Sequence, residues 1–433
     1  MVHRFTQDSR KLGLGLLAFV RSQTKNPLFW RESFLLILAN IIVTSLGLIR
    51  TPLITWTIPK EQVGMLGVIA SWMPFLQLAS LTGLDTASYH YTSKGQPWAL
   101  IINITHRLRW SILSAAGLLC GAIYWAWQRE PGLAWLFIIA GISYPLTAGL
   151  SAVSGTLGAQ ERYKALFWYR IWESLTDFTG FIPLVFSTWW VNQIVTFYGA
   201  NQLATLIMQV GYSIWIIIPI YKARTNRLSQ QEEKELIRYG KHQTVINGIS
   251  VLNSRIDAVL VSIFLPLNTM ADYSIALLVY EQLKRLWNVY ITIRYPKLVR
   301  MPLLELWRQF LREGMLVLLG FSGLGIALAV AGYWLIPHIL PSSYTTSLGF
   351  IVLLILAFLV SLPAGITDTY FRTQQDHKPQ YFLRFTGVII GLIASLLLLP
   401  RWGAYGVASG KILAALAQSA MGTALFLKNS PKS

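Results

Sequence analysis

Long apolar runs alternate with short polar breaks over almost the whole chain. A helix needs about 20 consecutive, mostly apolar residues to cross the hydrocarbon core of a bilayer. The runs that approach or exceed this length fall near 34–57, 63–84, 107–127, 133–156, 165–190, 194–221, 243–266, 271–293, 314–340, 346–370, 383–400 and 403–427. This pattern predicts an all-α polytopic membrane protein with about 12 transmembrane helices.

The longest polar break, 222–241, separates six runs from six. We expect five segments: a cytoplasmic or interfacial N-terminal segment (1–33), a first half (34–221), a cytoplasmic linker (222–241), a second half (242–427) and a cytoplasmic tail (428–433). Within the first segment, the apolar stretch 12–20 is too short to span and is followed by no small-residue cleavage site. It is typical of an interfacial helix, with a flexible tail as the alternative.

The two halves share an internal repeat. Shifting the sequence by 207 positions places Asn40 on Asn247 and Pro59 on Pro266, and "FYGA" near the end of the first half on "AYGV" near the end of the second. Six spans per half make the repeats parallel, related by an axis along the membrane normal. The expected architecture is therefore two parallel six-helix repeats around a central cavity.

Charge is scarce and asymmetrically placed. Of 433 residues, 54% are hydrophobic and 12% charged, against about 25% charged in soluble chains. The net charge is +18, yet nearly all Lys and Arg outside the spans lie on the side that holds both termini. Only Lys60, Arg129 and Arg401 fall in breaks on the other side. By the positive-inside rule, both termini are cytoplasmic and the basic residues meet anionic lipids, which argues against a nucleic-acid partner.

The seventh run carries two opposite charges near its centre, Arg255 and Asp257. A charge inside the bilayer costs about 2.5–3.5 kcal/mol on insertion scales, so it faces a partner or a hydrated cavity. Two residues apart on a helix differ by about 200° around the axis, so these charges cannot pair with each other on a regular helix. Each needs a partner on another element.

Further charges lie within other spans. The cations that we expect in the cavity are Arg50, Arg255 and Lys284; the expected counter-charges or coupling groups are Asp257, Glu281, Glu173 and Asp177. A buried network between helices is the alternative for the whole set. Arg170 shares one face of the fifth span with Glu173 and Asp177, but it lies near a span end, where a long side chain can reach the headgroups.

No catalytic or metal-binding pattern accompanies these charges. Cys120 is the only cysteine, the six histidines lack metal-ligand spacing, and there is no phosphate-binding loop for ATP. The breaks on the outer side are too short to hold a catalytic domain. We therefore expect a transporter rather than an enzyme, with no cofactor and no metal, and with H⁺ or Na⁺ as the coupling ion if transport is coupled.

Several local motifs resemble one known family, the bacterial polysaccharide-export and O-antigen-type oligosaccharide flippases of the multidrug/oligosaccharidyl-lipid/polysaccharide (MOP) superfamily. The resemblance covers nearly the whole chain. It rests on "GLDTASYHY" (83–91), "GAQERYKA" (158–165), "LNSRIDAVL" with "DYSIAL" (272–277), and "WGAYGVASG" at the start of the last span.

The resemblance implies a flippase that moves a polyprenyl-pyrophosphate-linked oligosaccharide across the bacterial cytoplasmic (inner) membrane by alternating access. By that analogy Arg50, Arg255 and Lys284 engage the pyrophosphate. Other polysaccharide-assembly membrane proteins are then expected partners. Two alternatives stay open at this point: a cation-coupled multidrug exporter of the same superfamily, and a membrane polymerase or ligase of the polysaccharide pathway.

Overall fold

The structure is a computed structural model that describes residues 27–186, 193–223, 227–299, 303–374 and 377–428. Every regular element in these ranges is a helix. The first half contains α2 (Pro27–Thr57), α3 (Lys60–Gln77), α4 (Leu84–Ser93), α5 (Ala99–Trp127), α6 (Pro131–Leu150), α7 (Ala152–Ala159), α8 (Tyr163–Thr176), α9 (Phe181–Phe186) and α10 (Gln193–Ala223). The second half contains α11 (Gln230–Phe264), α12 (Leu267–Val299), α13 (Leu303–Ile339), α14 (Ser347–Thr373) and α15 (His377–Lys428). Short 3-10 turns lie at Leu78–Ser80 and Ser342–Tyr344.

The all-α polytopic fold is confirmed, whereas the count of about twelve spans is not. Within the described ranges, nine segments are long and apolar enough to cross a membrane. One of them, in α15, contains the eleventh and twelfth predicted runs, joined at Gly403, whose φ of 55° kinks the helix. The charged α12 falls outside the nine. The count of twelve spans therefore stays a prediction.

Two helix boundaries differ from the sequence-based expectation. The fifth run, 165–190, is split into α8 and α9, because the chain turns at Gly180, whose backbone N–H donates to Asn201 Oδ1 at 2.6 Å. A side chain at Gly180 would collide with the backbone of Phe197 on α10. The polar segment from 230 to 241 is helical and continuous with the seventh run. It begins at a capping box formed by Ser229 and Glu232.

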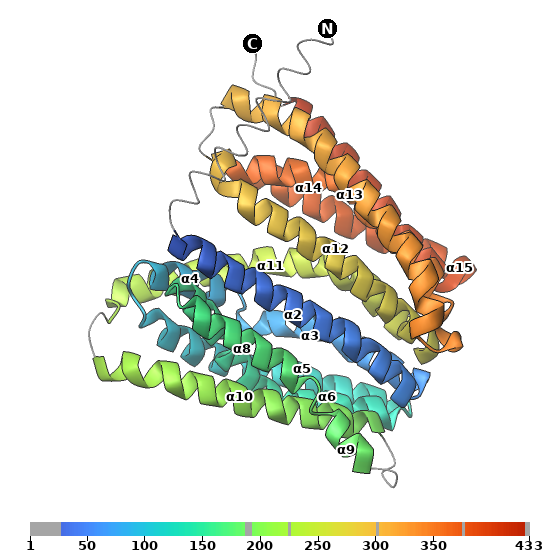
Figure 1. The fold of residues 1–433 in the computed structure, drawn as a ribbon, viewed down its shortest axis with the longest axis horizontal. Coiled ribbons are helices and arrows are strands. Elements are labelled where there is room, and N and C mark those ends of the chain that lie inside the picture. Colours follow the sequence, from blue (N-terminus) through green and yellow to red (C-terminus); the bar gives the residue numbers. More distant parts are fainter. Residues whose placement is uncertain (1–26, 187–192, 224–226, 300–302, 375–376, 429–433) are drawn as a thin grey trace.

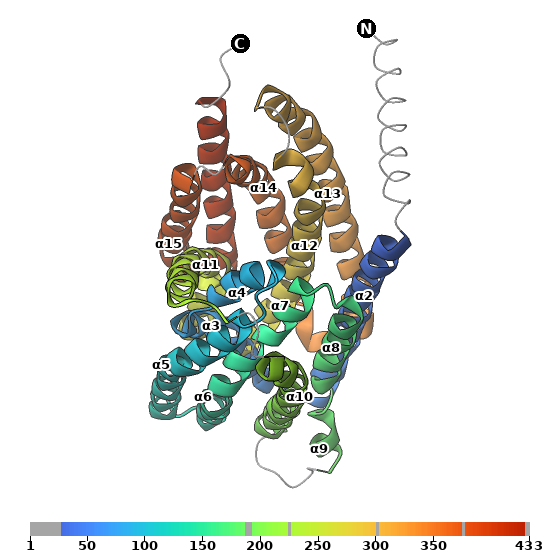
Figure 2. The same cartoon turned by 90° about the vertical axis from the view of Figure 1, so that its left-hand side faces the viewer.

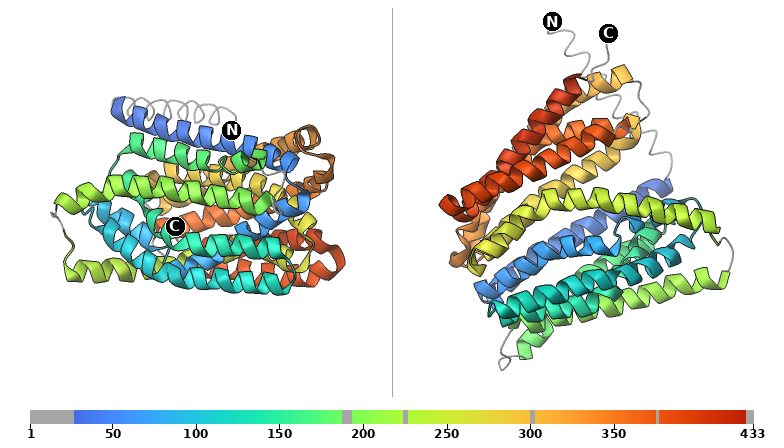
Figure 3. Two further views of the ribbon diagram at one scale, coloured as in Figure 1. Left: turned by 90° about the horizontal axis from the view of Figure 1, so that it is seen from below. Right: turned by 180° about the vertical axis from the view of Figure 1, so that it is seen from behind.

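The repeat is visible in the helix boundaries. α2 ends at Thr57 and α11 at Phe264, and α3 begins at Lys60 and α12 at Leu267, so both turns recur after 207 residues. We call the end of the molecule with these two turns the outer end, after the predicted orientation, and the opposite end the inner end. The two bundles meet at the outer end and spread apart toward the inner end (Figures 1 and 3).

The helices that join the halves are α3, α11 and α12. α3 packs on both α11 and α12, and α11 also packs on α4 of the first half and on α15 of the second. Figure 2, which looks onto the inner end, shows α11 and α4 side by side, whereas α2 lies away from α11. The halves are thus held together along α3, α4, α11 and α12.

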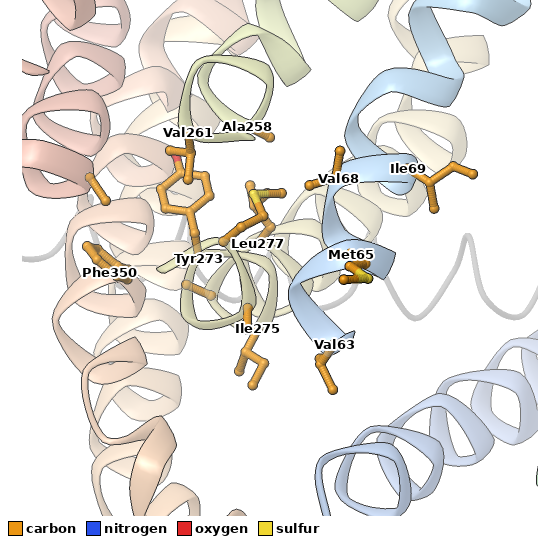
Figure 4. Close-up of a cluster of buried hydrophobic side chains, with 14 of the residues drawn as sticks. Val63, Met65, Val68, Ile69, Ala258, Val261, Tyr273, Ile275, Leu277 and Phe350 are labelled. Atoms are coloured by element: carbon orange, nitrogen blue, oxygen red, sulfur yellow. The ribbon is translucent and has the colours of Figure 1, made fainter. Parts of the chain in front are cut away.

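The largest buried apolar cluster lies across this junction. Figure 4 shows Val68 of α3 facing side chains of α11 and α12, and Tyr273 of α12 packs against Phe350 of α14. Small residues permit the close approach: a side chain added at Gly64 would collide with the Leu267 carbonyl oxygen. Lipid tails are as apolar as the helix surfaces, so close packing rather than the hydrophobic effect stabilises such contacts.

Candidate functional site

In the first half, the charged residues of α8 face α2. Arg50 Nη1 lies 3.1 Å from Asp177 Oδ2, the residue at the C-terminal cap of α8. About two turns earlier, Arg170 Nη1 donates to Asn40 Oδ1 of α2 at 3.0 Å. The Arg50 and Asp177 side chains keep 28% and 45% of their surfaces exposed. This pair is therefore reachable by a ligand or by water.

Glu173 lies between these contacts in the sequence, three residues after Arg170 and four before Asp177. On an α-helix this spacing places the three side chains on one face, as the sequence predicts. The opposite face of α8 carries Trp168 and Trp172, both about half exposed. Arg170 and Asp177 of α8 thus contact α2, whereas the two tryptophans lie on the opposite face of the helix.

In the second half, the two central charges of α11 have different partners. Arg255 forms an ion pair with Glu281 of α12, and both side chains are about one quarter exposed. Asp257 instead faces α15, where Lys411 Nζ lies 2.6 Å from its Oδ2 atom. The expectation that Arg255 and Asp257 do not pair with each other agrees with this geometry.

The Asp257–Lys411 pair is deeply buried, with side-chain exposures of 3% and 9%. The Tyr273 hydroxyl also donates to Asp257 Oδ2, at 2.6 Å. Lys411 Nζ donates to the Ser254 carbonyl at 3.3 Å and lies 4.5 Å from the centre of the Tyr280 ring. The carboxylate, a carbonyl and an aromatic face thus surround this ammonium group.

Lys284 also lies near Tyr280, with its Nζ atom 5.6 Å from the ring centre. It is partly exposed and follows Glu281 by three residues on α12. Lys284 therefore belongs to the same part of α12 as the Arg255–Glu281 pair.

The predicted site residues thus divide into two groups, one in each half. Arg50, Asp177 and Glu173 lie on α2 and α8; Arg255, Glu281, Lys284 and Asp257 lie on α11 and α12. Arg50 and Arg255 each pair with a carboxylate of their own half. Their roles in binding substrate stay predictions.

An ionic contact that the sequence pattern does not predict lies at the outer end of the junction. Lys60 Nζ, at the start of α3, lies 2.8 Å from Asp272 Oδ2 of α12 and donates to the Ser343 carbonyl at 2.5 Å. Nearby, Trp56 Nε1 donates to the Ile339 carbonyl at 2.7 Å. We call these contacts the outer seam, because each joins the two halves. The sequence feature that points to this contact is that Lys60 is one of the few cations expected on the outer side.

A second missed cluster lies at the inner end. Arg107 of α5 donates to both oxygens of Asp85 of α4 at 2.6 Å, and Asn103 donates to the same carboxylate. Arg107 is almost fully buried. This cluster fixes the "GLDTASYHY" motif to α5, which is a structural role.

At the same end, α4 is fastened to α11. The Gly83 N–H donates to Thr244 Oγ1 at 3.0 Å, and Gln96 donates to Glu232 at 2.9 Å. Among the described residues, no group of three His, Cys, Asp or Glu side chains is placed to hold a metal ion.

A family model described as polysaccharide biosynthesis protein matches residues 29–302, well over half of the chain. The chain belongs to this family. A search of curated protein sequences gave no match. The family assignment confirms the resemblance inferred from the motifs.

Solved structures with a similar fold include MOP-superfamily transporters. An inward-facing multidrug resistance MATE transporter has a TM-score of 0.62 at 13% identity, over 89% of this chain and 96% of that one. An outward-facing multidrug resistance MATE transporter scores 0.54 at 12% identity, over 92% and 95%. A MOP transporter from Pyrococcus furiosus, described as having a binding pocket of reverse polarity, scores 0.52 at 13% identity, over 93% and 96%. Family and fold together support a multi-pass membrane transporter of the MOP superfamily.

Proposed function

We propose that this protein is a flippase that moves a polyprenyl-pyrophosphate-linked oligosaccharide across the bacterial cytoplasmic membrane, with both termini in the cytoplasm. The observation that carries the proposal is the pair of partly exposed arginine–carboxylate contacts, Arg50–Asp177 and Arg255–Glu281, one in each half. Arginine binds phosphate groups through several donors at once. Each half thus offers one accessible arginine that could bind phosphate groups.

The physical task requires polar groups within the membrane. Sugars and pyrophosphate cannot enter hydrocarbon without losing their hydrogen bonds to water, which is prohibitive. The lipid tail of the ligand can remain in the bilayer while the head group passes between the halves. Lys284, partly exposed beside the Arg255–Glu281 pair, would add a third cation to the same path.

The arrangement of the helices suits loading from the cytoplasmic side. The outer seam joins the halves at one end, while the bundles spread apart at the other (Figure 1). In alternating access, substrate would enter from the inner end and the seam would open afterwards. We assign Asp257 as the counter-charge of Lys411, and Glu173, Asp177 and Glu281 as the groups through which H⁺ or Na⁺ would couple to transport.

The proposal is tested in a strain whose only copy of the gene carries Arg50→Ala or Arg255→Ala. We expect surface polysaccharide to fall at least tenfold at unchanged protein level, and the lipid-linked oligosaccharide to accumulate in the membrane. Arg285→Ala is the matched control, because Arg285 is an exposed arginine on α12 beside Lys284. Normal polymer export by both arginine variants would refute the role of these cations.

A cation-coupled multidrug exporter is the second candidate, because the first two of these structural neighbours are multidrug transporters. The presence of arginines among the accessible charges favours an anionic ligand instead. A drug-susceptibility panel on the deletion strain separates the two candidates. The exporter predicts sensitisation to cationic drugs with normal surface polysaccharide, and the flippase predicts the reverse.

A further inference from the structure

An apolar groove lies between α8 and α10, away from the charged residues described above. Its volume is about 750 Å³, within the range of small-molecule sites. Trp168 and Trp172 of α8 form one wall, and Ile207, Met208 and Trp215 of α10 form the other. The three tryptophans are each about half exposed, so the groove opens on the membrane-facing surface. We call it the tryptophan groove.

The floor of the tryptophan groove is open at Gly211. A Cβ atom added to this glycine would have no atom within 4 Å. Glycine inside a helix costs about 1 kcal/mol relative to alanine, so its presence here is not explained by helix stability. It leaves room beside the tryptophan rings for another apolar group.

A cation marks the inner rim of the groove. The Arg162 guanidinium carbon lies 4.4 Å from the centre of the Trp215 ring. Arg162 is exposed, and none of the described carboxylates forms an ion pair with it. Lys164, two residues later, is also exposed; Glu161 is the one acid beside them. This end of α8 lies where the predicted orientation places the phosphate groups of the cytoplasmic leaflet.

We propose that the tryptophan groove binds an acyl chain of an anionic phospholipid from the cytoplasmic leaflet, with the phosphate at Arg162. The walls supply apolar and aromatic surface for a hydrocarbon chain, no described cation lines them, and Arg162 is at the rim, where a head group would be. An anionic head group offers Arg162 the partner that the protein does not provide. The proposal does not depend on the flippase function.

The transported lipid is not the occupant, because of the geometry of α8. Trp168 and Arg170 are two residues apart and differ by about 200° around the helix axis. An acyl chain against Trp168 and Trp172 therefore lies on the far side of α8 from Arg50 and Asp177. It would instead brace α8 against α10, and α8 in turn holds α2 through those charges.

The test measures lipid retention by native mass spectrometry. Purified protein is released from bilayers of equimolar phosphatidylglycerol and phosphatidylcholine, and retained lipids are counted. We expect the wild type to retain one lipid molecule, and this lipid to be phosphatidylglycerol rather than phosphatidylcholine. Gly211→Leu, which fills the groove, should lose that lipid; Gly320→Leu is its control, because Gly320 is an exposed helical glycine with equally open space.

Charge and shape are tested separately. Arg162→Ala should keep a retained lipid but lower the preference for phosphatidylglycerol about fivefold, the equivalent of ~1 kcal/mol. Arg109→Ala, which removes an exposed arginine at the inner part of α5, is its control and should change nothing. Each variant is first shown to be monodisperse, and Trp168→Ala with Trp172→Ala provides a second way to weaken the groove.

Three results would overturn the proposal. Retention by Gly211→Leu and by the tryptophan variant equal to that of Gly320→Leu would show that the groove holds no lipid. An unchanged preference for phosphatidylglycerol in Arg162→Ala would show that Arg162 does not bind the head group. Displacement of the retained lipid by polyprenyl phosphate, but not by added phosphatidylglycerol, would identify an isoprenoid chain as the occupant instead.

Discussion

Replacing Lys411 with methionine tests which charges belong to the scaffold. The substitution keeps a long side chain but removes the ammonium group that lies 2.6 Å from Asp257. Asp257 would then be a carboxylate with 3% side-chain exposure, and among the described side chains the Tyr273 hydroxyl would be its one remaining hydrogen-bond donor. Its Oδ1 atom already has no hydrogen-bond partner. Breaking a buried pair by removing one partner costs about 3–5 kcal/mol.

The double variant Lys411→Met with Asp257→Asn isolates the pair. Asparagine keeps the shape of the side chain and can accept the Tyr273 hydrogen bond without a charge. Both single variants leave one uncompensated charge, whereas the double variant leaves none. We expect the double variant to be more stable than the sum of the two singles predicts, with a coupling free energy of about 2–3 kcal/mol.

The measurement is equilibrium unfolding in mixed micelles with increasing dodecyl sulfate, followed by tryptophan fluorescence and circular dichroism. Arg372→Met is the control, because Arg372 is about half exposed where it pairs with Asp368 one turn away. Exposed pairs of this kind contribute about 0–1 kcal/mol. If Lys411→Met cost no more than this control, or if the double variant were the least stable of the set, the scaffold interpretation would be wrong.

Two further predictions concern the outer end. Lys60→Met should loosen the outer seam, because Lys60 contacts Asp272 and the Ser343 carbonyl. The assay uses a Cys120→Ser protein with a reporter cysteine, Val63→Cys, and a membrane-impermeant maleimide applied from outside. The reporter cysteine should be labelled several-fold faster when Lys60→Met is present than when Lys60 is kept. An unchanged labelling rate would contradict a role of Lys60 in closing the outer end. Burial, and after it the neighbouring Glu61, raises the pKa of the Glu130 carboxyl. The ionised carboxylate therefore destabilises the folded state, and this loss of stability grows as the pH rises from the ordinary pKa of a glutamate through the raised pKa. Glu130→Gln should therefore increase the melting temperature at pH 7 but not at pH 4, and an equal increase at both pH values would exclude ionisation as the cause.

The fold could be predicted from the sequence where one helix corresponds to one apolar run. The α11–α12 turn, for example, follows from Pro266 and the repeat with Pro59. The break between α8 and α9 could not be predicted in this way, because it depends on Asn201 and on the approach of Phe197, both on α10. The start of α11 at Gln230 could have been predicted from the sequence, because Ser229 and Glu232 have the spacing of a capping box.

For the site, the sequence predicted which helices carry charge but not how the charges pair. Periodicity shows that Arg255 and Asp257 point in different directions, and the structure agrees. It does not reveal that Asp257 meets Lys411, 154 residues later, because that contact depends on how α15 packs against α11. The Lys60–Asp272 pair also depends on helix packing, and neither residue stands out in the sequence, because each lies near a helix end, where charged residues are common.

The burial of each ion pair indicates which pairs can exchange partners during transport. A pyrophosphate must compete with the carboxylate that already neutralises an arginine. For the partly exposed pairs Arg50–Asp177 and Arg255–Glu281 that competition costs little, because water can stabilise the released carboxylate. For Asp257–Lys411 it would leave a buried charge without a partner, at about 3–5 kcal/mol. A transport cycle that repeatedly binds and releases an anion is therefore better served by the exposed arginines, and Lys411 is better placed to keep α15 against α11 while they do so.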